Sequence, residues 1–305
     1  MNITLTGNLG SGKGSVSETF KAKGFGYVSG GDIFRGVAKE KGITVVEMNE
    51  LAKKDRSIDD LIDARSTRLG DELDNTLFDS RLAWNFVRES FKVFLLVDTD
   101  ESARRVFSGK SREMEEYASQ EECAEGLATR ANLERDRFSS LYNIDYYAKE
   151  NYDLIIESTN ATPEQIASEI ERCFEEYKKQ KFATRILLNL KAMYPMTDLT
   201  EKELEEVQKA AQKQAKDGAA LCLKTPVKIV SDGGYNYLCT GAAEAMAAVA
   251  EGAVFASVES FKKSSCCAAL TTEGLQAIEK AAGFSYRSLP TEKHVKHDYM
   301  MDLSC

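Results

Sequence analysis

The chain of 305 residues carries 49 acidic and 40 basic residues, which gives a net charge of −9 and a pI of about 5.1. This length can form more than one domain, and the acidic charge argues against broad binding of nucleic acids or anionic membranes. No apolar run approaches the roughly 20 residues that span a bilayer, and no cleavable signal is expected because the first strand begins at Met1. Seven cysteines, an odd number without the spacing of metal ligands, indicate free thiols and a cytoplasmic protein.

The first predicted strand, Ile3–Thr6, leads into a glycine-rich loop with the sequence Gly7-Asn8-Leu9-Gly10-Ser11-Gly12-Lys13-Gly14-Ser15. Closely spaced glycines allow successive backbone N–H groups to point at a phosphate, Lys13 adds a positive charge, and a helix follows. The loop is therefore predicted to bind the phosphates of a nucleotide. Gly14 replaces the hydroxyl that commonly binds Mg²⁺ directly after the lysine, so Ser15 is the candidate metal ligand.

Short apolar strands alternate with helices as far as about residue 180. The strands are predicted at Tyr27–Ser29, Thr76–Phe78, Val93–Val97 and Leu154–Glu157, and helices follow Gly12, Gly31, Asp59, Glu101, Gln120 and Thr162. This alternation predicts a parallel sheet with helices on both faces, which is an α/β domain of three layers over residues 1–180. Thr162-Pro163 is a favourable helix start, since threonine caps a helix and proline suits its first turn.

Polar residues follow the second and third predicted strands. Ser29, Asp32 and Arg35 follow the second, and Asp79 and Arg81 follow the third. Ligands bind at the carboxyl ends of parallel strands, and the planar fork of arginine holds two phosphate oxygens at once. Both arginines are therefore candidate anion-binding residues.

Residues 120–141 form a highly charged predicted helix that includes Arg130 and Arg137. One interpretation is a solvated helix with charge pairs four residues apart. The other is a mobile helical lid that brings its arginines onto phosphates. The sequence pattern leaves both interpretations open.

The stretch Gln180–Leu199, which contains Pro195, is interpreted as a connector to a small α+β domain over residues 200–305. This domain begins with a capping box formed by Thr200 and Glu203, and its first helix is expected to end at Asp217-Gly218. The further predicted elements are a hairpin of Pro226–Val230 and Tyr235–Cys239 about the turn Ser231–Gly234, a helix Ala242–Ala250, a strand Val254–Val258 and a helix Thr272–Ala282.

The motifs of residues 1 to about 170, in their order and spacing, resemble those of the archaeal-type cytidylate kinases. They are the Gly-Lys-Gly-Ser loop, the segment Ser29–Arg35, the pair Asp63 and Arg65, the segment Asp79–Trp84, and two arginines seven apart (Arg130 and Arg137) followed by Leu141–Asp145. Ser80 stands where that family has glycine, and the glycine that the family has before its tryptophan is missing. These departures bear on acceptor choice and rate more than on the fold.

The resemblance implies a P-loop domain with a helical lid that transfers the γ-phosphoryl group of ATP, with Mg²⁺, to the phosphate of CMP or dCMP. Residues 7–15 would bind ATP, and Lys13, Arg130 and Arg137 would be catalytic. The acceptor nucleotide would be held by Ser29, Asp32, Arg35, Arg65, Asp79 and Arg81. Trp84 is interpreted as part of the core or of the cavity wall.

The segment from Pro226 to Val258 resembles the core of a ParB-like domain, but Thr240–Glu244 lacks the reactive residues of that family. The resemblance implies an accessory domain that contributes self-association or a protein contact. His294 and His297 lie three residues apart and are interpreted as part of an exposed tail rather than as metal ligands.

Two alternatives to a cytidylate kinase stay open. One is a kinase for another nucleoside monophosphate, although the Gly-Phe-Pro-Arg segment of adenylate kinases is absent and Asp79-Ser80-Arg81 stands in its place. The other is a regulator that senses nucleotides without catalysis, which the altered lid and the additional unit favour.

Overall fold

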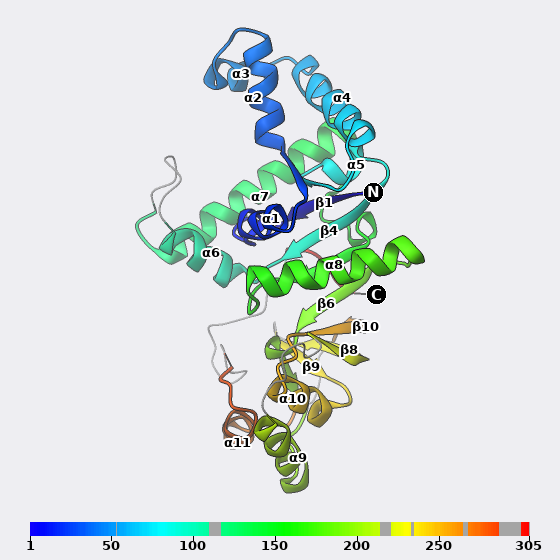
Figure 1. Cartoon of the computed structure of the whole chain (residues 1–305). Helices are drawn as coiled ribbons and strands as arrows, with labels where there is room; N and C mark the ends of the chain where they lie inside the picture. Colours follow the sequence, from blue (N-terminus) through cyan, green and yellow to red (C-terminus); the bar gives the residue numbers. More distant parts are fainter. Residues whose placement is uncertain are drawn as a thin grey trace.

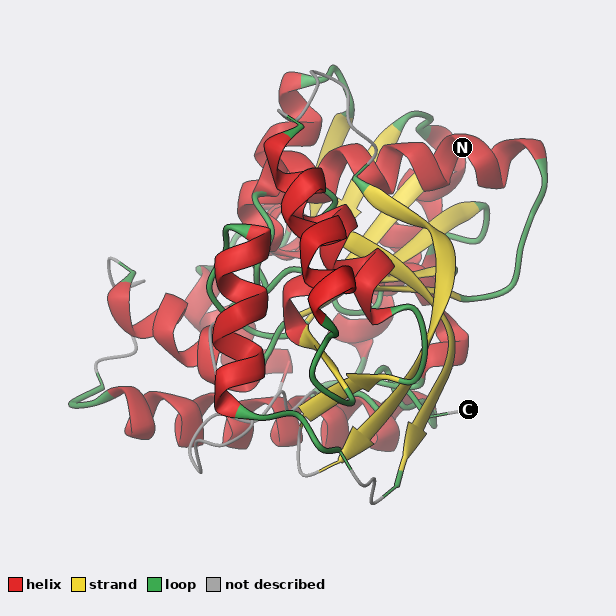
Figure 2. Ribbon diagram, turned by 90° about the horizontal axis from the view of Figure 1, so that it is seen from below, coloured by secondary structure: helices red, strands yellow, loops and turns green. Residues whose placement is uncertain are grey.

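The computed structural model describes residues 1–52, 54–109, 117–213, 221–232, 235–264, 268–286 and 300–304. The strands of the described residues form one ten-stranded sheet with the order β2-β3-β1-β4-β5-β6-β10-β8-β9-β7 (Figure 1). The view from below shows how strongly this sheet twists between its two ends (Figure 2). The predicted α/β class with a mostly parallel central sheet is confirmed.

The first half of the sheet is entirely parallel. Its strands are β1 (Asn2–Gly7), β2 (Gly26–Ser29), β3 (Thr76–Asp79), β4 (Ser90–Leu96), β5 (Leu154–Glu157) and β6 (Arg185–Asn189). The five strands predicted in residues 1–180 are therefore confirmed. Because every strand runs the same way, their carboxyl ends lie at one edge of the sheet, where open α/β sheets bind ligands.

Helices bury both faces of this half. Helices α1 (Lys13–Ala22) and α8 (Pro163–Lys179) pack together over one face, and the short helix α5 (Ala83–Phe86) packs on the other. Side chains alternate between the two faces, so that Val93 and Leu95 lie in the core beneath α1 and α8, whereas Phe94 and Leu96 lie in the opposite core with Trp84. Burial on both faces explains the nearly continuous apolar runs of these strands.

Two groups of helices project from the carboxyl edge of the sheet. Helices α2 (Gly30–Glu40), α3 (Val45–Ala52) and α4 (Ser57–Glu72) form an arm with its own small core around Met48 (Figure 1). Helices α6 (Thr99–Ser108) and α7 (Gln120–Tyr142) pack against each other as the second projection. The sequence pattern predicted the α-helices of the first half except for α3 and α5, which are only eight and four residues long.

The predicted connector Gln180–Leu199 is wrong. This stretch contains β6, the 3₁₀ turn Leu190–Ala192 and β7 (Met193–Pro195), and β6 pairs with β5 in parallel, from Leu154 with Arg185 to Ile156 with Leu187. The apolar run Ile186–Leu188 is buried within the sheet. The sequence did not predict a strand here because the run has only three residues and the same stretch contains Pro195. The division into domains at residues 180 and 200 stays a prediction, and one sheet runs through both parts.

The second half of the sheet is mixed. Strand β10 (Phe255–Lys263) is antiparallel to β6, β8 (Cys222–Asp232) is parallel to β10, and β9 (Tyr235–Leu238) is antiparallel to β8. The predicted hairpin is thereby confirmed. Strand β7 pairs with β9 at the edge.

Three helices cover one face of this second half. They are α9 (Glu201–Gln212), α10 (Ala242–Ala250) and α11 (Thr272–Ala282). The capping box at Thr200 and the helix start at Thr162-Pro163 are confirmed, as are the bounds of α10 and α11. Helix α9 ends at Gln212, before the predicted end at Asp217-Gly218, which lies outside the described residues.

The opposite face of the second half is exposed in part, along β8, whereas the residues of β9 and β7 are buried on both faces. Along β8, Val227 and Ile229 are buried while Lys228 between them is exposed. The resemblance to a ParB-like domain stays a prediction. His294, His297, Cys266, Cys267 and Cys305 lie outside the described residues, whereas the other four cysteines are free thiols, as predicted. No described helix has the length and apolarity that a membrane span requires.

Candidate active site

The glycine-rich loop joins β1 to α1, as the motif requires. Gly10 and Gly12 have φ values of +69° and +83°, which side-chain-bearing residues rarely adopt. A Cβ atom on Gly7 would lie 2.6 Å from the Leu95 carbonyl oxygen, so the loop also needs the close approach of a bare backbone there. The Lys13 Nζ donates to the Gly7 carbonyl at 3.4 Å, which places the ammonium group over the loop.

Helix α6 and the end of β4 hold the loop in this shape. Ser102 Oγ donates to the Leu9 carbonyl at 2.7 Å, and Arg105 Nη1 donates to the Gly10 carbonyl at 3.4 Å. The Asn8 side-chain oxygen accepts from the Val97 N–H at 3.1 Å. The loop is therefore preorganised by neighbouring elements, which lowers the ordering cost of binding an anion.

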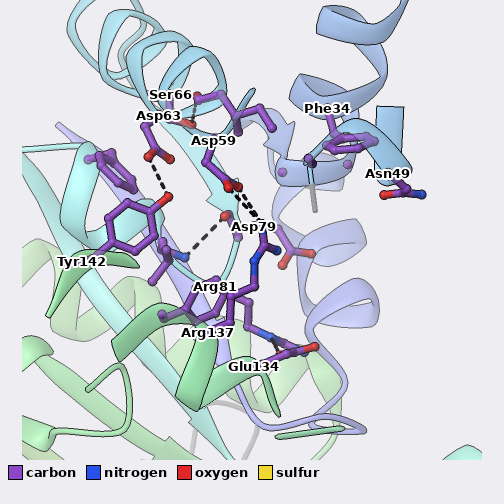
Figure 3. A pocket seen from close by; sticks show the side chains of 18 of the residues that line it. Phe34, Asn49, Asp59, Asp63, Ser66, Asp79, Arg81, Glu134, Arg137 and Tyr142 are labelled. Carbon is purple, nitrogen blue, oxygen red and sulfur yellow. Dashed lines mark hydrogen bonds and ion pairs between the residues drawn. The ribbon is translucent and has the colours of Figure 1, made fainter. Parts of the chain in front are cut away.

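A cavity of about 980 Å³ opens beside Lys13, between the arm of α2–α4 and helix α7 (Figure 3). Its polar lining includes Lys13, Asn49, Glu50, Asp59, Asp63, Ser66, Asp79, Ser80, Arg81, Arg130, Glu134, Arg137 and Tyr142. Its apolar lining includes Phe34, Val45, Val46, Ile62, Phe86 and Phe138. Converging charges beside an apolar wall suit a ligand that carries both a phosphate and a flat ring.

Glu134 joins two arginines at the floor of this cavity. Arg81 Nε donates to Glu134 Oε2 at 2.8 Å, and Arg130 Nε donates to Glu134 Oε1 at 3.1 Å. Arg81 also donates from Nη1 to the Gly7 carbonyl at 3.0 Å, which links it to the glycine-rich loop. Burial alone would raise the pKa of Glu134, but Arg81 and Arg130 outweigh it and hold the pKa of this carboxyl below its usual range.

Two further pairs connect α7 to the arm. Arg137 Nη2 donates to both carboxylate oxygens of Asp59, at 2.8 and 3.0 Å, and Tyr142 Oη donates to Asp63 Oδ2 at 2.8 Å (Figure 3). Burial raises the pKa of Asp63 to about 6, even though the Tyr142 hydrogen bond and Arg56 favour its ionised form. The cavity therefore holds one carboxyl group that titrates close to neutral pH.

The structure brings some of the predicted site residues together and leaves others apart. Lys13, Asp79, Arg81, Arg130 and Arg137 all line the cavity. Their predicted roles stay predictions, but their convergence supports the choice of these five. Trp84 is buried in the core beside Tyr152, with ring centroids 5.7 Å apart, as its interpretation required.

The predicted acceptor residues on the arm lie outside the cavity lining. Ser29 and Asp32 form the capping box of α2, and Arg35 pairs with Asp32 at 2.7 Å, which together with the Ser29 hydroxyl lowers the pKa of Asp32. Arg65 pairs with Glu40 between α4 and α2. Their proposed contacts with an acceptor require movement of the arm.

Sequence reasoning assigned no role to Glu134, Asp63 or Tyr142. A signal for two of them exists in hindsight, because Arg130, Glu134, Phe138 and Tyr142 follow one another at intervals of four on α7. This spacing places them on one face of a helix, and that face lines the cavity. The charged helix is therefore not simply solvated, because the ion pairs of Arg130 and Arg137 line the cavity.

The model of the cytidylate kinase-like family matches residues 2–160. The cytidylate kinase of Methanobrevibacter smithii is 33% identical over 167 residues, which cover 54% of this chain and 94% of that protein. The cytidylate kinase of Sulfolobus acidocaldarius is 33% identical over 170 residues, covering 55% and 90% respectively. A solved shikimate kinase from Bacteroides thetaiotaomicron is similar with 19% identity and a TM-score of 0.41, covering 58% of this chain and 98% of its own, a likeness too distant to carry an argument.

Proposed function

The chain belongs to the cytidylate kinase-like family, and we propose that it is a nucleoside monophosphate kinase that phosphorylates CMP or dCMP with ATP. The observation that carries this proposal is the cavity that joins Lys13 and the glycine-rich loop to Arg81, Arg130 and Arg137. A site with cations at the donor loop and further cations across the cavity suits two phosphate-bearing substrates.

The reaction is an in-line transfer, in which an oxygen of the acceptor phosphate attacks the γ-phosphorus and the bond to the β-phosphate oxygen breaks. Both reactants are polyanions, so positioning and charge neutralisation supply most of the catalysis. Lys13 contacts the donor phosphates, Arg81 holds the acceptor phosphate, and Arg130 and Arg137 stabilise the transferring group. The acceptor phosphate oxygen is already ionised near neutral pH, so the reaction requires no general base.

The ion pairs of the cavity support these roles for the arginines. Glu134 pairs with Arg81 and Arg130, and Asp59 pairs with Arg137. A phosphate that enters shares or replaces these carboxylates as the partner of each guanidinium. Closure of the arm then brings Ser29, Asp32, Arg35 and Arg65 toward the acceptor.

Mg²⁺ fits this site as part of the ATP complex. Mg²⁺ in such sites uses one or two protein oxygens together with phosphate oxygens and water. Asp79 lines the same cavity as Lys13, and Ser15 lies exposed in the first turn of α1, so these two side chains would supply the protein oxygens. When bound, the ion neutralises charge on the phosphates.

A coupled assay of ATP consumption with CMP, dCMP, UMP, AMP and GMP tests the proposal. We expect CMP or dCMP to give the highest kcat/KM. Lys13→Ala is expected to lower kcat on the order of 10²- to 10³-fold because a cation that stabilises the transition state is lost. Lys209→Ala, in an exposed residue of α9, is the matched control and should retain full activity.

Two outcomes would contradict the proposal. If no monophosphate accelerates ATP consumption, the chain is a nucleotide-binding regulator rather than a kinase. If AMP, UMP or GMP is the best acceptor, the kinase activity stands and the choice of cytidine nucleotides is wrong.

A further inference from the structure

We propose that the C-terminal segment, residues 300–304, positions the glycine-rich loop for phosphoryl transfer by holding Tyr147 against Asn8. Met300 and Tyr147 are then positioning residues, which act on the reaction through the loop. The inference rests on the proposed kinase function, because the loop is the proposed donor site. The observation behind it is a hydrogen bond of 3.6 Å that the Tyr147 hydroxyl donates to Met300 Sδ.

The C-terminal segment is fastened to both halves of the sheet. It buries two apolar side chains in the large core that both halves share, namely Met301 and Leu303. Asp302 pairs with Lys263 of β10 at 3.3 Å, and Lys149, in the chain that follows α7, donates from Nζ to the Ser304 carbonyl. The segment therefore connects the second half of the sheet to the chain at the base of α7.

Tyr147 is held firmly at this point. Its ring centroid lies 4.3 Å from that of Tyr146 and 5.9 Å from that of Phe94, and its backbone N–H donates to Asp145 Oδ1 at 3.0 Å. A thioether sulfur accepts hydrogen bonds and donates none, so Met300 directs the hydroxyl hydrogen of Tyr147 toward itself. The lone pairs of the Tyr147 oxygen are then available to other donors.

Asn8 of the glycine-rich loop supplies such a donor. Its side-chain oxygen accepts from the Val97 N–H at 3.1 Å, which fixes the direction of the amide. Its Nδ2 is buried and has no hydrogen-bond partner within the described part of the chain, an arrangement that is costly unless an acceptor is close. A small shift of the loop onto a phosphate lets Nδ2 donate to the Tyr147 oxygen.

The electrostatic surroundings of Tyr147 agree with this arrangement. Burial raises the pKa of Tyr147, whereas the Tyr146 hydroxyl, Arg81 and the Asn8 side chain act to lower it. Groups that act on this pKa lie close to the hydroxyl. Tyr147 is therefore placed next to both the donor loop and the arginine that is proposed to hold the acceptor phosphate.

This placement matters because Asn8 directly follows Gly7. Arg81 Nη1 donates to the Gly7 carbonyl at 3.0 Å, so a displacement of Asn8 also changes the contact between the donor loop and Arg81. In-line transfer depends on the alignment of the two phosphates, and a misplacement of about 1 Å can cost on the order of 10²-fold in rate.

The second half of the sheet contains a matched pair for the control. The Tyr286 hydroxyl donates to Met246 Sδ at 3.1 Å, and both side chains are buried in the same large core without lining the cavity. Met196, which is partly buried against that core as Met300 is, provides the matched methionine. Tyr286→Phe and Met196→Ala therefore remove the same groups as Tyr147→Phe and Met300→Ala, away from the loop.

The experiment measures kcat, with ATP and CMP saturating, and thermal unfolding of these variants in the whole chain. Tyr147→Phe should lower kcat about tenfold and Met300→Ala about threefold, because the loop is less precisely placed. The two control variants should lose similar thermal stability but keep kcat within about twofold, since their sites do not touch the loop. In the double variant, Met300→Ala should have no further effect on kcat, because Met300 acts through the Tyr147 hydroxyl.

Two results would overturn the inference while the kinase activity stands. One is a kcat within twofold of the wild type for both Tyr147→Phe and Met300→Ala. The other is a double variant in which the two losses multiply, since Met300 would then not act through Tyr147. If Tyr147→Phe does not fold, Met300→Ala compared with Met196→Ala decides, and equal kcat values overturn the inference.

The failure of the proposed function gives a different result. If the wild type has no kinase activity, calorimetric binding of ATP to the same variants provides the test. Weaker ATP binding by Tyr147→Phe and Met300→Ala than by their matched controls would support the positioning of the loop. Equal affinities for each matched pair would overturn it.

Discussion

The two halves of the sheet place their charges differently. In the parallel half, Arg81, Arg130 and Arg137 converge with acidic partners on one cavity. In the mixed half, the ion pairs lie on the surface, as between Lys228 and Glu259 or between Lys213 and Glu251. Surface pairs contribute little to stability, whereas a partly buried cluster fixes geometry and is costly to disrupt.

The direction of the strands explains this difference. Parallel strands bring all their carboxyl ends to one edge, so Gly7, Ser29 and Asp79, which end three neighbouring strands, lie along the same edge. In the mixed half, β10 and β8 run opposite to β9 and β7, so the carboxyl ends of these strands are divided between the two edges. A catalytic site is accordingly expected in the first half, and a structural contribution in the second.

The largest expected effect concerns whether the first half folds without the second. A chain ending at residue 183 loses β6, which leaves β5 as an open edge and removes Leu187 and Phe255 from the core around α1 and α8. We expect this fragment to unfold at a lower temperature than the whole chain and to aggregate more readily, because an unpaired apolar edge strand promotes aggregation. Circular dichroism and limited proteolysis of fragments 1–183 and 1–213 provide the measurement. A folded, active fragment 1–183 would show that the halves are independent.

The same junction shows how far the fold follows from the sequence. Strands β1 to β5 were predictable because each is a short apolar run followed by a helix signal. Strand β6 was not, because Arg185–Asn189 has only three apolar residues and is defined as a strand by its pairing with β5 and β10. Helix α3 was missed for a similar reason, since its eight residues are held by packing of Met48 against α2 and α4.

The residues of the candidate site also divide into those that the sequence predicts and those that it does not. Lys13, Asp79 and Arg81 were predictable because each lies in a motif at the end of a strand. Glu134 and the Asp63–Tyr142 pair were not, because their partners are 53 and 79 residues away in the chain. Only the packing of α7 against the arm brings these groups together.

The next largest expected effect is on the free energy of unfolding, compared between one ion pair from each half of the sheet. Glu134→Ala leaves the largely buried Arg81 without its carboxylate, and we expect it to lower the free energy of unfolding by about 2 kcal/mol. Glu205→Ala removes an exposed partner of Lys209 on α9 and should cost about 0.3 kcal/mol. Urea unfolding of both variants at 0.1 M salt measures the difference. Equal costs would mean that the cavity cluster behaves like an ordinary surface pair.

The smallest expected effect concerns the pH dependence of stability in the first half. The pKa of Asp63 is raised to about 6 in the folded state, so the folded protein holds this proton more tightly than the unfolded chain. Stability is therefore greatest below the unfolded pKa near 4, and it falls as the pH rises through about 6.

Asparagine cannot ionise, so Asp63→Asn should exceed the wild type in stability by about 1 kcal/mol at pH 7.5, after allowance for partial exposure, and the gain should shrink toward pH 4. Asp60→Asn, on the exposed side of the same helix, should change stability by less than about 0.5 kcal/mol. Thermal unfolding between pH 4 and 8 tests this, and a gain for Asp63→Asn that does not vary with pH would show that ionisation of Asp63 is not the cause. A gain that grows with pH would mean that the first half keeps a buried carboxylate at the expense of its own stability, which the surface pairs of the second half do not require.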